Sequence, residues 1–133
     1  MRESLRGAAF VVVVASAVIA VAARAQPSCQ APQKPMLDVE LMLGRTGSDA
    51  RWARFLAREV TPRFPDGLTV YETTGQWRDP ATNAIARERS RVLRIIVPAE
   101  TVADKIAAVA DAYKKLFRQK SIGVVTRQVC ASF

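Results

Sequence analysis

The sequence predicts an α+β fold of the ferredoxin-like split βαβ type (β-α-β-β-α-β), an antiparallel sheet with two helices on one face. Two segments repeat apolar residues at helical spacing, and four others alternate or cluster apolar residues as strands do. Their order along the chain is strand, helix, strand, strand, helix, strand. We therefore expect one small domain whose second sheet face is open to water, a ligand or a partner.

The start of the chain has the composition of a secretory signal peptide. Arg2 and Arg6 precede an apolar run at residues 10–22, which is shorter than the roughly 20 residues of a spanning helix. Residues 23–25 (Ala-Arg-Ala) supply a small-x-small cleavage pattern. An uncleaved N-terminal anchor is the alternative; after cleavage we expect no transmembrane segment and a periplasmic or extracellular location. The predicted organisation is a signal peptide at 1–25, an extended proline-rich leader at 26–36 and one α+β domain at 37–133.

The first strand and helix of the domain follow from simple periodicities. Apolar and polar residues alternate over residues 37–43, which predicts a strand with one apolar face. Ser48 is a good N-cap, and Asp49 lies favourably in the first turn of the helix that follows. Because the residue before a proline avoids helical geometry, Pro62 predicts that this helix ends near Val60. Its predicted apolar face consists of Trp52, Phe55, Leu56 and Val60.

The second and third strands are read from apolar runs on either side of a turn. Residues 68–72 predict the second strand, which residues 73–77 continue after a bend at Gly75. Residues 79–83 form a turn, and a third strand follows from about Ile85 to Val97. The outer half of this third strand is polar, so we expect that half to project beyond the core.

The second helix and the last strand complete the domain. Pro98 is expected to start the helix, and Asp111 and Lys115 are expected to pair on its outer face. The last strand is predicted at residues 121–129. The buried stripe of the helix is predicted to be Val102, Ile106, Val109, Tyr113 and Leu116 or Phe117.

The two cysteines predict a disulfide. Cys29 lies near the start of the exported part and Cys130 near its end. An even number of cysteines in an oxidising compartment indicates pairing, and we predict the bridge Cys29–Cys130. Such a bridge closes a loop of about 100 residues, which a chain-entropy argument values at about 4 to 5 kcal/mol.

Charge and composition narrow the function classes. The formal net charge is +8, and removing residues 1–25 takes away three basic residues and one acidic residue to leave +6. This balance fits anionic lipid headgroups, acidic envelope polymers or nucleic acid. Export argues against nucleic acid, and a merely solvated surface is the simplest interpretation. With no histidine and no glycine-rich phosphate loop, the chain predicts no metal site, no cofactor and no Ser-His or Cys-His nucleophile.

The segment from Thr61 to Arg78 (TPRFPDGLTVYETTGQWR) has an unusual composition for a segment that connects two elements. Two prolines fix its backbone, and Asp66-Gly67 is a turn signal. One interpretation is a rigid link that aligns the first helix with the second strand and buries Phe64 and Leu68. The other is a ligand rim formed by Arg63, Asp66, Tyr71, Trp77 and Arg78.

The open sheet face offers a second set of candidates. Because their strand neighbours are apolar, the residues expected there include Asp38, Glu40, Met42, Thr69 and Tyr71. Glu40 and Glu88 fall on strands that are adjacent in this fold, where two carboxylates can share a proton or act as acid and base. The alternative is that each pairs with a nearby arginine, the commoner use of charged strand residues.

A set of short motifs resembles a known family. It comprises residues 40–45, Trp52 and Phe55, TPRFPDGLTV at 61–70, GQW at 75–77, RERS at 87–90, YKKLFRQ at 113–119 and Cys130. Together they resemble the bacterial family catalogued as domain of unknown function 3574, over roughly Leu37 to Phe133. The resemblance implies an exported or envelope-associated bacterial protein, and it implies no activity and no site residues.

The sequence supports a binding module most directly: an exported protein that holds a small anionic ligand or an envelope partner on its open face or its rim. The alternative is a cofactor-free enzyme of the ferredoxin-like dimer type, with Glu40 or Glu88 as general base and an arginine steadying the developing anion. A structural envelope protein is the third option. By fold analogy, the open face also allows a homodimer.

Overall fold

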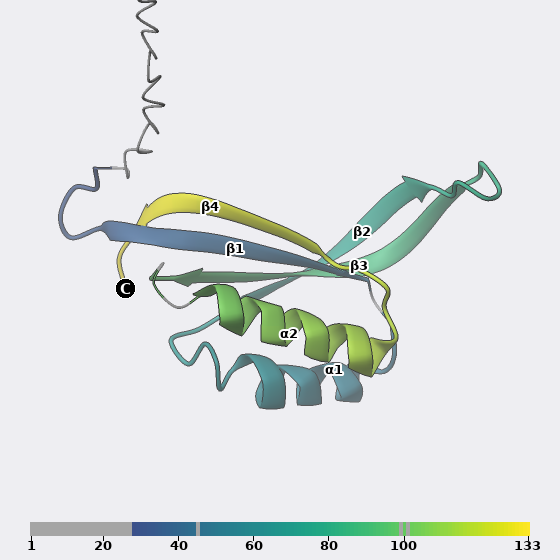
Figure 1. Cartoon of the computed structure of the whole chain (residues 1–133), viewed down its shortest axis with the longest axis horizontal. Coiled ribbons are helices and arrows are strands. Elements are labelled where there is room, and N and C mark those ends of the chain that lie inside the picture. The colour runs from purple at the N-terminus through teal and green to yellow at the C-terminus, as the bar shows by residue number, and fades with distance from the viewer. Residues whose placement is uncertain (1–27, 45, 99, 101) are drawn as a thin grey trace, which may run out of the picture.

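The computed structural model describes residues 28–44, 46–98, 100 and 102–133. The predicted signal peptide lies outside the described residues. In chain order the elements are β1 (Lys34–Gly44), α1 (Asp49–Phe55), the π-helical turn η1 (Leu56–Val60), β2 (Thr69–Arg78), β3 (Ile85–Val97), α2 (Val102–Phe117) and β4 (Gly123–Ala131) (Figure 1).

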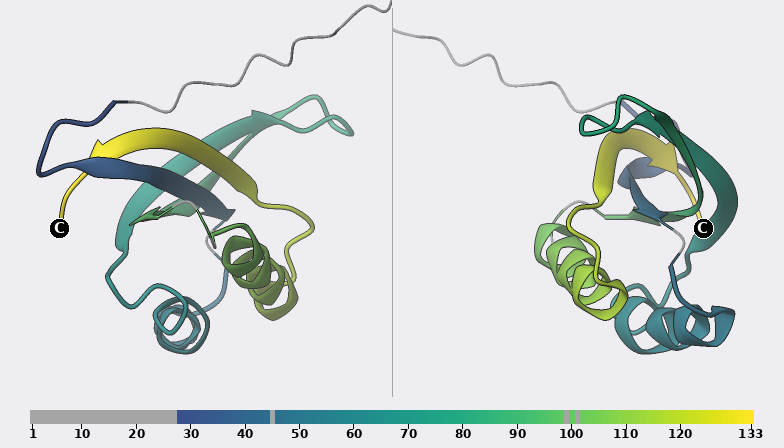
Figure 2. Two further views of the ribbon diagram at one scale, coloured as in Figure 1. Left: turned by 60° about the vertical axis from the view of Figure 1, so that its left-hand side comes forward. Right: turned by 90° about the vertical axis from the view of Figure 1, so that its right-hand side faces the viewer.

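The four strands form one antiparallel sheet in the order β2-β3-β1-β4. Both helices lie on the same side of this sheet, and the turned views of Figure 2 show the same layering. Strand order and helix placement are those of the ferredoxin-like split βαβ arrangement. The predicted fold class is confirmed.

The pairing register assigns every strand residue to a face. In β1, Val39, Leu41 and Leu43 are buried against the helices, so Asp38, Glu40 and Met42 lie on the opposite face. Pairing with β1 and β3 carries this alternation to the other strands. We call the side without helices the open face. It includes the residues predicted for it, Asp38, Glu40, Met42, Thr69 and Tyr71, and in β3 it takes Ser90, Val92, Arg94 and Ile96.

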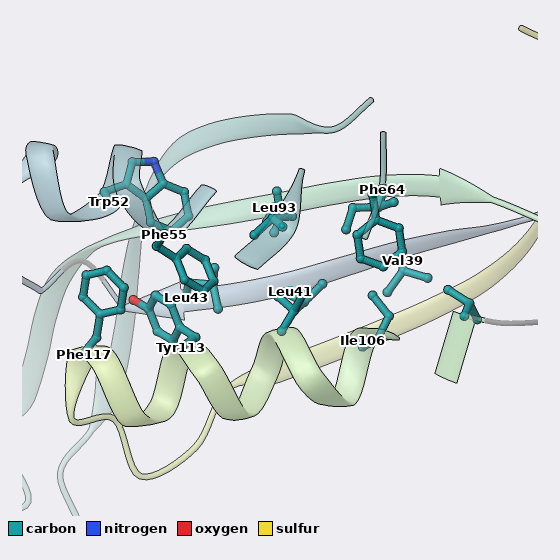
Figure 3. Packing of buried hydrophobic residues seen from close by; sticks show 14 residues of the cluster. Val39, Leu41, Leu43, Trp52, Phe55, Phe64, Leu93, Ile106, Tyr113 and Phe117 are labelled. Atoms are coloured by element: carbon teal, nitrogen blue, oxygen red, sulfur yellow. The ribbon is translucent and has the colours of Figure 1, made fainter. Parts of the chain in front are cut away.

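The core lies between the sheet and the helices, and its densest part is aromatic (Figure 3). Tyr113 stacks on Phe117 with ring centroids 4.6 Å apart, and Phe55 meets both rings edge-on. Such pairs add about 0.5 to 1.5 kcal/mol each beyond the area that they bury. Trp52 closes the cluster from α1, so the predicted apolar faces of both helices meet as expected.

Helix α1 begins as its sequence indicates. Ser48 has extended backbone geometry, and its Oγ accepts a hydrogen bond from Arg51 N at 3.3 Å. Phe64 of the following loop is buried and Leu68 packs against the core. The linking role predicted for this loop therefore has its expected apolar anchors.

The bounds of three elements differ from the predictions. Strand β1 begins at Lys34, three residues before the expected Leu37, because pairing with β4 extends along the leader. Helix α2 begins at Val102 and not at Pro98, since β3 stays paired with β1 up to Val97. Strand β4 runs two residues later than expected.

The structure also settles two details of helix α2, the residue that ends its buried stripe and the partner of Asp111. Leu116 is 44 % exposed, so Phe117 is the residue that ends the buried stripe. Asp111 pairs with Lys114 at 2.8 Å, and not with Lys115 as predicted. Both lysines are within reach of one carboxylate on a helix, three and four residues away, and the nearer one takes it.

The hairpin of β2 and β3 extends beyond the rest of the sheet. Strand β1 pairs with β3 only as far as Gly44 and Ser90, whereas β2 and β3 stay paired out to Arg78 and Ile85. We call residues 74–89, the part beyond that last β1 pair, the arm. Figure 1 shows it leaving the sheet on the side away from the helices. The prediction that half of the third strand projects beyond the core is confirmed.

A disulfide joins Cys29 to Cys130 across 101 residues of sequence, with their Cα atoms 5.5 Å apart. The predicted bridge is therefore present, and it fastens the segment before β1 to the end of β4. In the part of the chain that the structure describes, no helix has the length and apolar character needed to cross a membrane.

Candidate functional site

Four charged side chains form a chain of ion pairs across the open face, and we call them the charged network. Arg94 donates from Nε to Asp38 Oδ1 at 2.8 Å and from Nη2 to Asp38 Oδ2 at 3.0 Å. Arg127 Nη2 lies 3.3 Å from Asp38 Oδ2 and 2.8 Å from Glu40 Oε1. The network thus joins β3, β1 and β4 and contains two positive and two negative groups.

Asp38 is the buried centre of the charged network, with 2 % of its surface exposed. The hydrogen bonds from Arg94 lower the pKa of Asp38 most, and the charges of Arg94 and Arg127 act in the same direction. Burial opposes them by penalising the charged form, but it does not prevail. Asp38 is therefore a firmly ionised anchor and not a proton donor near neutral pH.

Arg94 is held in place by its neighbours. Asp38 occupies two of the five N–H donors of its guanidinium and is the main cause of a raised pKa for Arg94. The hydroxyl of Tyr71 acts in the same direction. With 35 % of its side chain exposed, Arg94 presents a fixed positive charge at the surface of the open face.

A cleft of about 930 Å³ opens beside Arg94, and we call it the open-face cleft. Its volume lies within the roughly 300–1,000 Å³ typical of small-molecule sites. Strand residues on the open face form its floor, and the loop before β2 and the residues after β4 form its walls. The lining residues are Pro32, Lys34, Met36, Asp66, Gly67, Leu68, Thr69, Arg94, Ile96, Pro98, Ala131, Ser132 and Phe133.

The lining of the cleft combines positive charge with apolar surface. Lys34 and Arg94 supply two cations against the single carboxylate of Asp66. Met36 and Ile96 add an apolar floor between them. A cleft of this kind suits a ligand with an anionic group and an apolar body, because each part finds its complement.

The predicted ligand rim is divided between two ends of the molecule. Asp66 lines the cleft, and Arg63 faces a smaller hollow of about 190 Å³ that Asp66 also borders. Trp77 and Arg78 lie on the arm, at the far end of β2. Nine residues of strand separate Thr69 from Arg78, about 30 Å at the usual rise. The expected proximity of these side chains is therefore wrong, because β2 runs without interruption through Gly75 and carries Trp77 and Arg78 onto the arm.

Local contacts fix the two rim arginines. Arg63 pairs with Glu59 at 3.1 Å, one helical turn earlier. Arg78 donates to the backbone and side-chain oxygens of Asn83 at 3.2 Å, which closes the hairpin at the tip of the arm. Tyr71 lies between the two ends, on the open face beside Arg94.

Glu40 and Glu88 are also apart. Glu40 is opposite Arg94 in the β1–β3 register, whereas Glu88 lies six residues further along β3, about 20 Å away along the strand. Glu88 is on the arm opposite Gly75, and Glu40 pairs with Arg127. The two carboxylates do not form a pair, and for Glu40 the arginine-paired alternative describes the geometry.

Sequence reasoning missed Lys34, Arg94 and Arg127. Charged and apolar residues occur at both alternating positions of the third strand, so Arg94 could not be assigned to a face of the sheet. Lys34 fell in the segment assigned to the leader. The one available signal was Asp38, a carboxylate between Leu37 and Val39 in a strand whose other face is apolar. Such a residue needs a cationic partner on a neighbouring strand.

A second arginine cluster lies on the helix side of the sheet. Arg91 donates from Nε to Glu72 at 2.6 Å and from Nη2 to Asp49 at 2.8 Å, and its guanidinium lies 4.7 Å from the centroid of the Trp52 ring. Burial acts to lower the pKa of Arg91, but the hydrogen bonds and charges of Glu72 and Asp49 outweigh it, and the pKa is raised. Because its side chain is 5 % exposed, this cluster joins β2, β3 and α1 rather than contacting a ligand.

Comparisons with known proteins agree with this architecture. Residues 39–133 match the model of a family described as "Protein of unknown function (DUF3574)". No curated protein matches the sequence.

Solved structures share the fold at low identity. A phage SAM lyase in complex with S-methyl-5'-thioadenosine superposes with a TM-score of 0.54 at 12 % identity, over 83 % of this chain and 97 % of that one. The GlnK–ATP complex of B. subtilis gives 0.52 at 15 % identity, over 71 % and 82 % of the two chains. CutA from Synechococcus elongatus PCC7942 gives 0.52 at 9 %, over 74 % and 80 %. At these identities the likeness shows the fold alone.

Proposed function

We propose that this chain, which belongs to the family described as "Protein of unknown function (DUF3574)", is an exported bacterial binding module that holds a small anionic ligand in the open-face cleft. One observation carries the proposal. Arg94, fixed by its two hydrogen bonds to Asp38, lines a cleft that also contains Lys34 and the apolar side chains of Met36 and Ile96. The favoured ligand has a carboxylate or phosphate group and an apolar body.

The energetics of the cleft support recognition of an anion. Because Asp38 orients Arg94 before any ligand arrives, little side-chain entropy is lost on binding. Lys34 adds a flexible ammonium that can reach the same anionic group. Asp66 disfavours ligands with anionic groups at two separate positions and favours one that carries a hydrogen-bond donor near it.

The shared fold is compatible with this role. Two structural neighbours are complexes with small molecules, S-methyl-5'-thioadenosine in the phage SAM lyase and ATP in GlnK. They support the idea that a ferredoxin-like sheet can build a small-molecule site, and the residues for such a site here are those of this chain. Export is supported by the signal-peptide pattern at residues 1–25 and by the disulfide that holds β1 and β4 together.

Catalysis by a carboxylate base is less well supported. Glu40 is neutralised by Arg127, Glu88 stands on the arm, and the pKa of Asp38 is lowered rather than raised. A general base is most effective with a pKa near the working pH. Binding therefore remains the function that the geometry favours.

A pair of matched probes tests the proposal. We expect hexyl phosphate to raise the melting temperature of the purified protein saturably, and hexyltrimethylammonium, with the same alkyl chain and opposite charge, to leave it unchanged. A ligand at 100 times its dissociation constant adds about 2.7 kcal/mol, which is several degrees for a domain of this size.

Two charge-reversed variants locate the effect. Lys34→Glu should abolish the shift produced by hexyl phosphate, whereas Lys115→Glu, the same charge change on the exposed side of α2, should preserve it. Equal responses to both alkyl probes, or equal loss in both variants, would mean that the open-face cleft is not an anion site.

A further inference from the structure

We propose that the open face binds the open face of a second copy of this chain, and that this pairing encloses the cleft between the two copies. The dimer itself does not depend on the proposed function, but the enclosure of a ligand does. Three features of the open face carry the inference: its exposed apolar side chains, the balanced charges of the charged network and its extent.

The open face exposes more large apolar groups than a solvated sheet requires. Met42 is 47 % exposed and Tyr71 is 43 % exposed, and both lie opposite Val92 in the pairing of β1, β3 and β2. Trp77 continues the same face on the arm. The half-buried Val92 lies between Met42 and Tyr71, and the half-buried Ile96 and Val125 lie further along the same face. Interface cores are enriched in aromatic residues and methionine in this way.

The charge of the open face distinguishes it from the rest of the surface. The chain carries a formal net charge of +8, so two copies repel each other in most orientations. Within the charged network the two arginines balance Asp38 and Glu40, so the middle of the open face has little net charge, and Lys34 at one end of it is a further cation. Arg127 retains 52 % exposure of its side chain and Glu40 retains 22 %. A twofold axis that passes beside Arg127 and Glu40 would place the exposed arginine of each copy near the carboxylate of the other, and the interface would then be self-complementary.

The outer surface of the helices lacks these properties. Helix α1 and the turn η1 expose Arg51, Arg54 and Arg58, which all carry the same sign of charge. On α2 the exposed apolar residue is Leu116, and it stands beside Lys115. Like charges facing each other across an interface are unfavourable, so the side of this surface that α1 and η1 form is a poor contact surface for two copies.

The size of the open face is sufficient for a dimer. The central strand β1 has 11 residues, which span about 36 Å at the usual rise. Four strands spaced at about 4.8 Å give a footprint on the order of 700 Å². A stable interface buries about 800 Å² on each partner, and side-chain relief raises the accessible area above the flat footprint.

The position of the open-face cleft links dimerisation to binding. Lys34, Met36, Thr69, Arg94 and Ile96 all point to the open face, so a second copy placed there covers the mouth of the cleft. Covering it removes water from Arg94 and strengthens its attraction for an anion. A ligand in the cleft is then held between two copies, and its binding favours the dimer by mass action.

Sedimentation equilibrium of the purified protein, without any added probe, tests the inference. We expect a dimer for the parent chain and for Leu116→Lys, and a monomer for Met42→Lys. The two substituted residues have nearly equal exposure, 44 % and 47 %, so they differ mainly in the face that they occupy. Circular dichroism and thermal melting confirm that each variant is folded. Tyr71→Glu serves as the second open-face variant if Met42→Lys does not fold.

The outcomes separate the two proposals. A parent chain that remains monomeric up to about 100 µM, or a Leu116→Lys variant that dissociates while Met42→Lys stays dimeric, would overturn the dimer. A parent dimer that does not respond to hexyl phosphate would leave the interface in place and remove the proposed ligand. A parent chain that stays monomeric but binds hexyl phosphate through Lys34 would overturn the dimer and leave the proposed ligand site in place.

Discussion

Arg94 holds Asp38 through two parallel hydrogen bonds, of 2.8 Å and 3.0 Å, on the side of the sheet that carries no helices. The pair ties β3 to β1 and fixes the orientation of the guanidinium where it lines the cleft. A bidentate arginine–carboxylate pair is geometrically specific as well as strong. The same contact therefore stabilises the sheet and prepares the proposed binding site.

The ionised state of Asp38 makes a measurable contribution to acid stability. Its pKa is lower in the folded protein than in the unfolded chain, where it is about 3.9. Its contribution is fully present above that unfolded value and is lost as the pH falls through the folded one. We expect urea unfolding to show this loss below about pH 4 in the parent, and a smaller loss in Asp38→Asn.

The same variant has a cost at neutral pH. Asp38→Asn should lower the free energy of unfolding by about 2 kcal/mol, because two arginines lose their shared carboxylate inside the sheet. Asp111→Asn, an exposed carboxylate paired with Lys114 on α2, is the control and should cost less than about 1 kcal/mol. Equal costs for the two variants would contradict the assigned role of Asp38.

Arg91 offers a test of the helix side of the sheet. Arg91→Lys keeps the charge, but lysine has a single ammonium in place of the planar guanidinium. It cannot bind both Glu72 and Asp49 and also lie over the ring of Trp52. We expect denaturant unfolding to show a loss of about 2 kcal/mol. Arg89→Lys, two residues earlier on the same strand face and exposed, should change stability by less than about 0.5 kcal/mol. Should Arg91→Lys be as harmless as Arg89→Lys, Arg91 does not tie the layers together.

The disulfide should contribute strongly to folding. Cys29 and Cys130 are 101 residues apart in the sequence. For a loop of this length, loop-closure entropy predicts a stabilisation of about 4 to 5 kcal/mol, and measured bridges commonly contribute about 2 to 5 kcal/mol. The melting temperature should fall by more than 10 °C, on the order of magnitude set by that energy, when reductant is added. A double Cys→Ser variant should melt at the temperature of the reduced parent and should not respond to reductant. A parent unaffected by reductant would show that the bridge adds nothing to stability.

The sequence predicts the fold well where local patterns decide it. Alternation in β1 assigns Val39 and Leu41 to the core and Asp38 to the open face, and Ser48 caps α1 as its chemistry suggests. Both helices show their buried stripe directly. These features depend on residues close together in sequence, and their spacing is enough to reveal them.

The site could not be predicted in the same way because its contacts span the sheet. Asp38 meets Arg94 and Arg127, which follow it by 56 and 89 residues, and no local pattern marks either arginine as its partner. The third strand mixes charged and apolar residues at both parities, so its faces depend on the register with β1. The expected bend at Gly75 does not interrupt β2, and Trp77 and Arg78 are consequently carried onto the arm.

The position of an anionic probe is the most direct test of the central claim. Amide chemical shifts of ¹⁵N-labelled protein, followed during titration with hexyl phosphate, should change first at Lys34, Gly67, Thr69 and Ala131, which surround the open-face cleft. The amides of Asp111 and Lys115 on α2 should not move. Changes confined to Trp77 and Arg78 on the arm, or no saturable change anywhere, would contradict the proposal that the open-face cleft binds an anionic ligand.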